Sequence, residues 1–138
     1  MKKNSKIYFY FFFLFVFIVT ACSNEEMHIS EAKLSRAVQT GGFEDVGTTF
    51  KQTDEIFFFR IKVANVKENV TLKAVWHVVK VAVSEPMQLG ETEFVVVPPN
   101  EVANFQFGIA DLWPEGDYKV ELFVNNTLER TVEFQVEK

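Results

Sequence analysis

The sequence predicts one all-β domain over residues 28–138, a Greek-key sandwich of about seven strands. Two observations favour this class of fold. Apolar and polar residues alternate along several short segments, as they do in strands that are buried on one face. Gly, Pro and Asn residues separate these segments at regular intervals, which favours an antiparallel sandwich over a parallel sheet. Residues 22–138 suffice for one domain with one core.

The segment Leu112–Tyr118, which reads Leu-Trp-Pro-Glu-Gly-Asp-Tyr, is the predicted corner where the chain crosses from one sheet to the other. Pro114 cannot donate to a strand ladder, and Gly116 supplies the backbone freedom of a turn. Tyr118 opens a strand in which apolar residues alternate with others as far as Val124. A Tyr in this place can bury its ring and return its hydroxyl to the backbone upstream, as in a tyrosine corner.

The first segment of the domain, residues 28–38, has two interpretations. Apolar and polar residues alternate along it, which favours a strand at the edge of a sheet. Good helix formers in the same region leave a short helix as the alternative. After this segment, the sequence predicts a turn at residues 39–42, a loop at 43–47 and a short piece of strand at 48–50.

Two longer segments are expected to supply much of the core. The strand at residues 55–63 places Phe57, Phe59, Ile61 and Val63 on one face, and Ile56 and Phe58 on the other. The strand at residues 70–83 carries apolar residues on both faces, which indicates a bulge that swaps the faces midway. Trp76 lies in the middle of this second strand.

The remaining elements follow from turn residues. The expected elements are a loop at residues 84–90, a strand at 91–97 that Pro98-Pro99-Asn100-Glu101 ends, a strand marked by Phe105, Phe107 and Ile109, a two-residue turn at Asn125-Asn126, and a last strand at 128–136.

These features resemble immunoglobulin-like domains of bacterial exported proteins and lipoproteins. The matching residues are Phe50, Val63-Ala64-Asn65, Ala74-Val75-Trp76, the run Trp113 to Val120, and Glu133-Phe134-Gln135-Val136. The corner is also similar to that of fibronectin type III domains, with Glu115 inserted between Pro114 and Gly116. The resemblance implies a structural corner made by Trp113, Pro114, Gly116 and Tyr118. It implies an accessory or binding module and supports the fold more than the function.

The beginning of the chain predicts export. A basic head with Lys2, Lys3 and Lys6 precedes an apolar run from Ile7 to Ala21. A helix of that length is roughly 22 Å, which is short of the ~30 Å hydrocarbon core of a bilayer. Residues 1–21 are therefore interpreted as a secretory signal peptide.

Val19-Thr20-Ala21-Cys22 resembles the lipobox of bacterial lipoproteins. The resemblance implies attachment of a diacylglycerol to Cys22, cleavage before it and acylation of the new amino terminus, followed by a lipidated tether at residues 22–27. The domain would then lie outside the cytoplasm, held by membrane lipid at the bacterial cell membrane or the outer membrane. Ser23 in place of Asp favours the outer membrane in a cell that has two. The alternative is a free Cys22 in an uncleaved anchor.

The composition argues against several functions. Removal of Lys2, Lys3 and Lys6 leaves 11 basic and 19 acidic residues, a net charge of −8, which disfavours nucleic acid as a partner. His28 and His77 lack the ligand spacing of a zinc site, and Asp111, Glu115 and Asp117 lack the dense carboxylate loop of a calcium site. No metal, cofactor or catalytic residue is expected, and no motif of an enzyme is present.

The sequence therefore predicts a non-enzymatic binding or assembly module of the cell envelope, with an envelope protein as its partner. A strand edge or loops would recruit that partner. The alternative is an inhibitor that inserts a loop, either Ser84–Gly90 or Val97–Glu101, into the cleft of a hydrolase. Phe58 and Phe123 are expected on the less buried faces of their strands, where a shared aromatic patch would indicate a partner surface.

Overall fold

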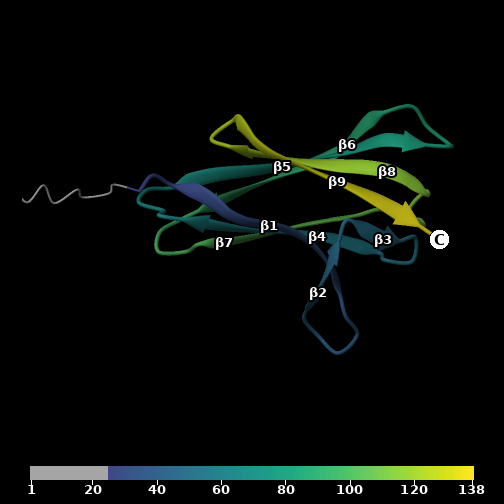
Figure 1. The fold of residues 1–138 in the computed structure, drawn as a ribbon, viewed down its shortest axis with the longest axis horizontal. Helices are drawn as coiled ribbons and strands as arrows, with labels where there is room; N and C mark the ends of the chain where they lie inside the picture. Colours follow the sequence, from purple (N-terminus) through teal and green to yellow (C-terminus); the bar gives the residue numbers. More distant parts are fainter. Residues whose placement is uncertain (1–24) are drawn as a thin grey trace, which may run out of the picture.

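The computed structural model describes residues 25–138, so the predicted signal peptide and Cys22 lie outside the described residues. The described part is all-β, with nine strands rather than about seven (Figure 1). The strands are β1 (His28–Ala37), β2 (Phe43–Gly47), β3 (Thr49–Lys51), β4 (Ile56–Ala64), β5 (Val70–Val81), β6 (Met87–Val96), β7 (Val102–Gly108), β8 (Gly116–Val124) and β9 (Thr127–Glu137).

The strands form two sheets that pack face to face. One sheet has the order β2-β1-β4-β7, and the other has the order β3-β9-β8-β5-β6. Pairing is antiparallel except between β3 and β9, which are parallel. The chain passes from β7 in the first sheet to β8 in the second through the predicted corner, so the crossing lies where the sequence places it.

The core consists of side chains that point inward from both sheets at every second position. Phe57, Phe59 and Ile61 on β4 are fully buried, as the alternation predicts. Aromatic rings join the sheets: Phe57 stacks on Trp113 with 4.0 Å between ring centroids and on Phe50 with 3.9 Å. These three rings are fully or almost fully buried, so each contributes a large apolar area to the core.

β1 is a strand, and the helix alternative is wrong. Its expected place at a sheet edge holds only in part, because β2 pairs with its final residues from Leu34 to Ala37. The predicted loop at 43–47 is this extra strand β2. Glu44 and Asp45 have low strand propensity, but the turn at Gly41-Gly42, with φ of +85° and +104°, folds the chain back into register. Tertiary pairing overrides the local propensity here.

The bulge that the sequence predicts in β5 is present. The register with β8 shifts between Val78 and Lys80, and both Val78 and Val81 then pack against the core although their positions differ in parity. The bulge thus swaps the faces of the strand near its end.

The predicted loop at 84–90 is wrong at its second half, because β6 begins at Met87. Gly90 looked like a turn residue, but it lies inside the strand against the Phe107 ring. A Cβ built on Gly90 would be 2.7 Å from Phe107 Cε2. The glycine therefore serves close packing between the two sheets and not a turn. The strand around Phe105 also ends one residue before Ile109.

The turn between β8 and β9 matches its prediction. Asn125 and Asn126 both have positive φ, at 48° and 67°, and Val124 pairs with Thr127 across them. This is the left-handed backbone that a two-residue hairpin needs, and Asn tolerates it better than most residues do.

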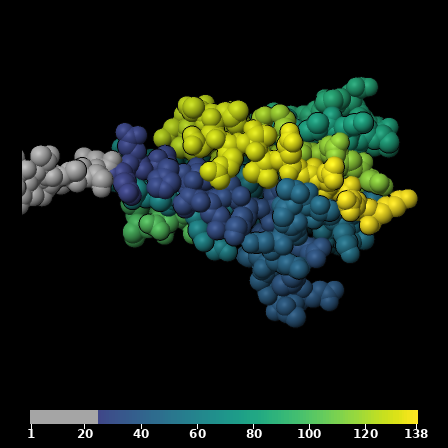
Figure 2. All heavy atoms as spheres, in the orientation of Figure 1, coloured from purple at the N-terminus to yellow at the C-terminus, as the bar shows by residue number. Residues whose placement is uncertain are grey.

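The two ends of the sandwich carry different connections. At the end where β1 begins, Asn65 bonds to Glu25, and the backbone of Val63 bonds to that of Glu101. The β4–β5, β6–β7 and β8–β9 connections gather there, whereas the β5–β6 connection, the corner and the C-terminus lie at the opposite end (Figure 1). The β1–β2 turn projects sideways from the body, as Figure 2 shows. The two candidate inhibitor loops consequently lie at opposite ends of the molecule.

Candidate binding site

The predicted corner residues come together around one hydrogen bond. The Tyr118 hydroxyl donates to the Pro114 carbonyl oxygen at 2.6 Å. The Tyr118 ring stacks on Phe134 and meets Trp113 edge-on, and burial raises the pKa of its hydroxyl. Gly116 is needed because a Cβ there would lie 2.2 Å from the Lys80 carbonyl oxygen. The corner is therefore rigid and positions the walls of the pocket beside it.

This pocket, the corner pocket, opens between the β5–β6 hairpin and the corner. Its volume is about 210 Å³. Its lining is almost wholly apolar and consists of Val78, Val81, Val83, Ser84, Met87, Leu89, Ile109, Trp113, Pro114 and Tyr118. The bulge in β5 supplies Val81, and the early start of β6 supplies Met87 and Leu89. The corner pocket exists because of two features of the strands and not because of a loop.

The mouth of the corner pocket combines exposed apolar and acidic side chains. Val83 is 77% exposed and Met87 is 53% exposed. Two exposed carboxylates, Glu85 and Glu115, directly adjoin the lining residues Ser84 and Pro114 in the chain. Neither makes an ion pair with another of the residues 25–138.

A second surface is the outer edge of β6. This strand ends its sheet and pairs only with β5, so one row of its backbone groups has no strand partner among the described residues. Phe94 is 43% exposed and Val95 46% exposed, and they point to opposite faces of the strand. The regular part of this open edge, from Gly90 to Val96, is long enough to pair with another strand.

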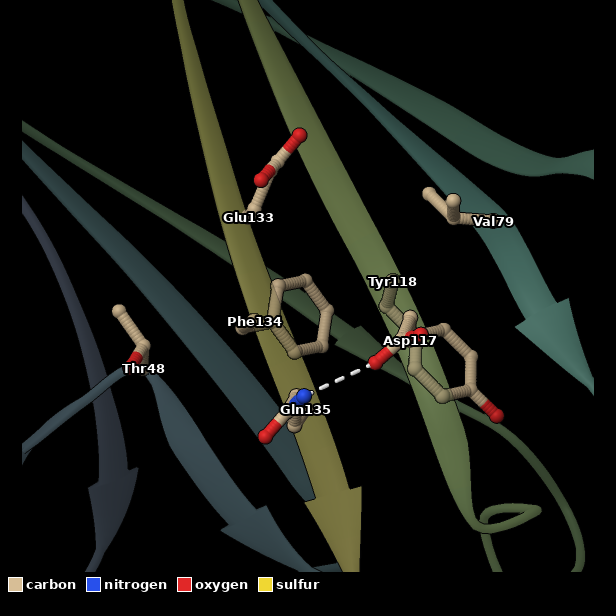
Figure 3. Close-up of a pocket in the computed structure, with 7 residues that line it drawn as sticks. All are labelled: Thr48, Val79, Asp117, Tyr118, Glu133, Phe134 and Gln135. Carbon is tan, nitrogen blue, oxygen red and sulfur yellow. Dashed lines mark hydrogen bonds between the residues drawn. The ribbon is translucent and has the colours of Figure 1, made fainter.

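A third feature is a wider hollow of about 500 Å³ on the outer face of β8 and β9 (Figure 3). Thr48, Val79, Asp117, Tyr118, Glu133, Phe134 and Gln135 line it. Figure 3 shows the Gln135 amide donating to the Asp117 carboxylate, at 3.0 Å. No His, Cys or Ser is among these lining residues.

The histidines that the sequence analysis weighed lie far apart in the fold. His77 Nε2 lies 3.0 Å from Glu121 Oε2, on the outer face of the five-stranded sheet, and Lys119 donates to the other oxygen of the same carboxylate. The pKa of Glu121 is lowered, chiefly by the Lys119 hydrogen bond and further by the nearby charges. His28 is exposed and contacts the Glu26 carbonyl. Among residues 25–138, no three His, Cys, Asp or Glu side chains form a group that could hold a metal ion.

Phe58 and Phe123 do not form a shared patch, because they lie on the outer faces of different sheets. Phe58 meets Phe43 of β2 edge-on at 4.8 Å, and Phe123 lies beneath the Lys73 ammonium group at 5.1 Å. Each ring instead has a local contact on its own sheet. Over residues 25–138, the structure has no helix with the length and hydropathy that a membrane crossing requires.

Comparison with known proteins supports the fold. No protein-family model matches the chain, and no curated protein matches it. An immunoglobulin-like protein of Pseudomonas aeruginosa has a similar structure, with a TM-score of 0.56 and 14% identity over 83% of this chain and 99% of that one. The described residues thus form an immunoglobulin-like β-sandwich.

Two larger proteins contain a more distant likeness. The alkylpurine DNA glycosylase AlkC of Pseudomonas fluorescens aligns with a TM-score of 0.49 and 12% identity, over 82% of this chain and 31% of that one. A β-glucosidase of Kluyveromyces marxianus aligns with a TM-score of 0.47 and 17% identity, over 82% of this chain and 14% of that one. These likenesses concern a domain-sized part of each enzyme.

The corner pocket was not predicted from the sequence. Its signal was present in the run Val78 to Val83, which is apolar at positions of both parities, and in Ile109, an apolar residue before the corner. Each signal was interpreted as a feature of one strand or turn. Only the fold brings them to the same end of the sandwich.

Proposed function

We propose that this chain is a lipid-anchored lipoprotein of the bacterial cell envelope, whose immunoglobulin-like domain is a non-enzymatic module that binds or assembles with an envelope protein. The open edge of β6 is the observation that carries the proposal. A partner strand that pairs with this edge would satisfy the free backbone groups and would cover Phe94 and Val95.

The glutamates of β6 restrict the register in which a second copy could pair with this edge. If two copies paired antiparallel about Thr92, Glu91 of each would stand opposite Glu93 of the other. Like charges directly opposite each other destabilise a strand pair. A partner strand with neutral or basic residues avoids this repulsion.

The arrangement of the domain suits a membrane anchor at Cys22. The described chain starts at the end where β1 begins, and a tether at residues 22–27 would hold that end near the lipid. The opposite end, with the β5–β6 hairpin and the corner pocket, would then point away from the bilayer. The lipobox residues Val19 to Cys22 support the anchor, at the cell membrane or the outer membrane.

A second candidate function is inhibition of a hydrolase by the β5–β6 hairpin. Val83, at 77% exposed, lies in the connection of this hairpin, and the bridge between Val81 and Ser84 holds the connection tight. The β6–β7 loop is less suited to such a role, because it lies at the end that the tether would hold near the membrane. In this function Val83 would enter the cleft of the enzyme.

Site-specific crosslinking in the native cells tests the proposal. A photoreactive residue replaces Val95 on the β6 edge or Leu128 on β9, which is similarly exposed at 50%. We expect one envelope protein to be captured from position 95, not from position 128, and the capture to be lost in the Cys22→Ser variant. Equal capture from both positions would contradict the β6 edge. A third variant carries the photoreactive residue in place of Val83. Capture of a hydrolase from this position alone would support the inhibitor function.

Mass spectrometry of the mature protein tests the anchor separately. We expect the chain to begin at Cys22 and to carry a diacylglycerol and an acyl group. A mature chain that retains residues 1–21, or an unmodified Cys22, would overturn the anchor and leave the β6 edge to be judged by the crosslinks.

A further inference from the structure

We propose that the corner pocket is an anchor site for one large apolar side chain of a partner polypeptide, with a Lys or Arg beside it in the partner sequence. The site is distinct from the open backbone edge of β6, and the proposal stands whether or not that edge binds a strand.

The size and lining of the pocket favour a single side chain. Pockets for small-molecule ligands usually have volumes of about 300–1,000 Å³. The corner pocket, at about 210 Å³, is smaller. Its walls are apolar apart from Ser84 and the polar groups of the Trp113 and Tyr118 side chains. An apolar side chain such as Leu, Met or Phe fits this chemistry, whereas a polar metabolite would leave its hydrogen bonds unmade.

The walls of the pocket are formed in advance of binding. Trp113 is 1% exposed and stacks on Phe57, and Tyr118 is 1% exposed and tied to Pro114 by its hydroxyl. A partner side chain would therefore enter a site that needs little reordering, which is the condition under which small contacts yield useful affinity.

The mouth of the pocket has the anatomy of a protein interface. Val83 and Met87 leave apolar surface in water around a concave centre. In protein interfaces, an anchor side chain fills such a pocket while the surrounding contacts exclude water from it. The exposed rim and the buried walls thus belong to the same site.

The charge of the rim selects the partner. Glu85 and Glu115 make no ion pairs among the described residues, and Lys80 is the basic residue nearest to them along β5. A basic residue next to the apolar anchor gains favourable interactions with these carboxylates. A second copy of this chain would bring the same acidic rim, so repulsion disfavours self-association through this site.

Selection from a random peptide library displayed on phage tests the proposal, with the full lipidated chain in nanodiscs as the target. Enriched peptides should share one large apolar residue flanked by Lys or Arg. Synthetic copies should bind the Met87→Asp variant at least tenfold more weakly than the unaltered chain. The Leu128→Asp variant, changed at a similarly exposed residue on β9, should bind them as the unaltered chain does.

Four outcomes would overturn the proposal. Enriched peptides without the apolar–basic pattern would contradict the stated occupant. Peptide binding that Met87→Asp leaves unchanged would show that peptides bind elsewhere. Binding of decanoate that Met87→Asp abolishes, with no peptide enrichment, would make the site one for an acyl chain. Self-association that Met87→Asp abolishes would make it an interface between two copies. The double variant Glu85→Lys/Glu115→Lys tests the charge alone. We expect it to weaken the binding of basic peptides more than the binding of a neutral analogue.

Discussion

The β2 and β6 strands are both edge strands, but they differ in length, in charge and in the apolar residues that they expose. β2 has 5 residues, carries Glu44 and Asp45, and is tied down by the Arg36–Glu44 ion pair at 2.9 Å. β6 has 10 residues and leaves Phe94 and Val95 exposed. Short length and charge are the usual protection of an edge strand against pairing with other chains. β2 is both short and charged, whereas β6 is twice as long and its charges Glu91 and Glu93 stop before the apolar end Phe94 to Val96. This difference distinguishes a closed edge from one open to a partner.

The largest effect is expected from alanine at the glycine of each edge strand. Gly90→Ala in β6 places a Cβ 2.7 Å from the Phe107 ring, so that ring must shift from its stack on Trp76. We expect the free energy of unfolding to fall by about 2 kcal/mol. The Cβ of Gly47→Ala in β2 meets no atom within 4 Å, and the only strain comes from the φ of +63°, so we expect a fall of about 1 kcal/mol. Urea unfolding measures both. Equal losses would mean that β6 is packed no more tightly on the core than β2.

A smaller effect separates the exposed apolar residues of the two edges. Phe43→Lys in β2 removes the edge-on contact with Phe58, and we expect it to cost about 1 kcal/mol of stability. Val95→Lys in β6 should change stability by less than about 0.5 kcal/mol, as surface substitutions usually do, while it abolishes binding of the envelope partner. A large stability loss from Val95→Lys would show that this residue serves the fold and not a partner.

The smallest effect concerns acid stability on the outer faces of the two sheets. The pKa of Glu121 is lowered by its hydrogen bond from Lys119, and that of Glu31 is lowered by its hydrogen bond from Lys33. A lowered pKa stabilises the fold above the usual value of 4.5, and this stability is lost as the pH falls through the folded-state value.

Glu121→Gln and Glu31→Gln should therefore each flatten the fall of stability between about pH 5 and 3, as followed by urea midpoints. Added salt should weaken the Glu31 effect more, since its ion pairs are more exposed than the pair of Glu121. A steeper fall in either variant would contradict the assigned direction of the shift.

The sequence predicted the fold where local pattern and tertiary environment agree. Period-two alternation identified the buried face of β4, and Asn125-Asn126 identified the hairpin turn, because both signals are local. β2 was missed because its pairing with β1, and not its own residues, makes it a strand. Gly90 was misread because its reason for being glycine is Phe107, 17 positions away in the chain.

The candidate sites were less predictable than the fold. The corner residues Trp113 to Tyr118 are contiguous in the chain, so the sequence could single them out. The corner pocket draws on β5, β6 and the corner together, and its volume depends on a bulge whose position no residue pattern specifies. The opposed placement of Phe58 and Phe123 likewise depends on which strand joins which sheet.

Hydrogen–deuterium exchange of the lipidated protein tests most directly whether β6 is the edge that a partner covers. Amides of purified protein in nanodiscs are compared with those of the same protein in native envelope vesicles. We predict that protection rises in the vesicles along Gly90 to Val96 of β6 and stays unchanged along β2. The Val95→Lys variant should show no rise. Equal exchange of β6 in both preparations, or protection gained at β2 instead, would contradict the account.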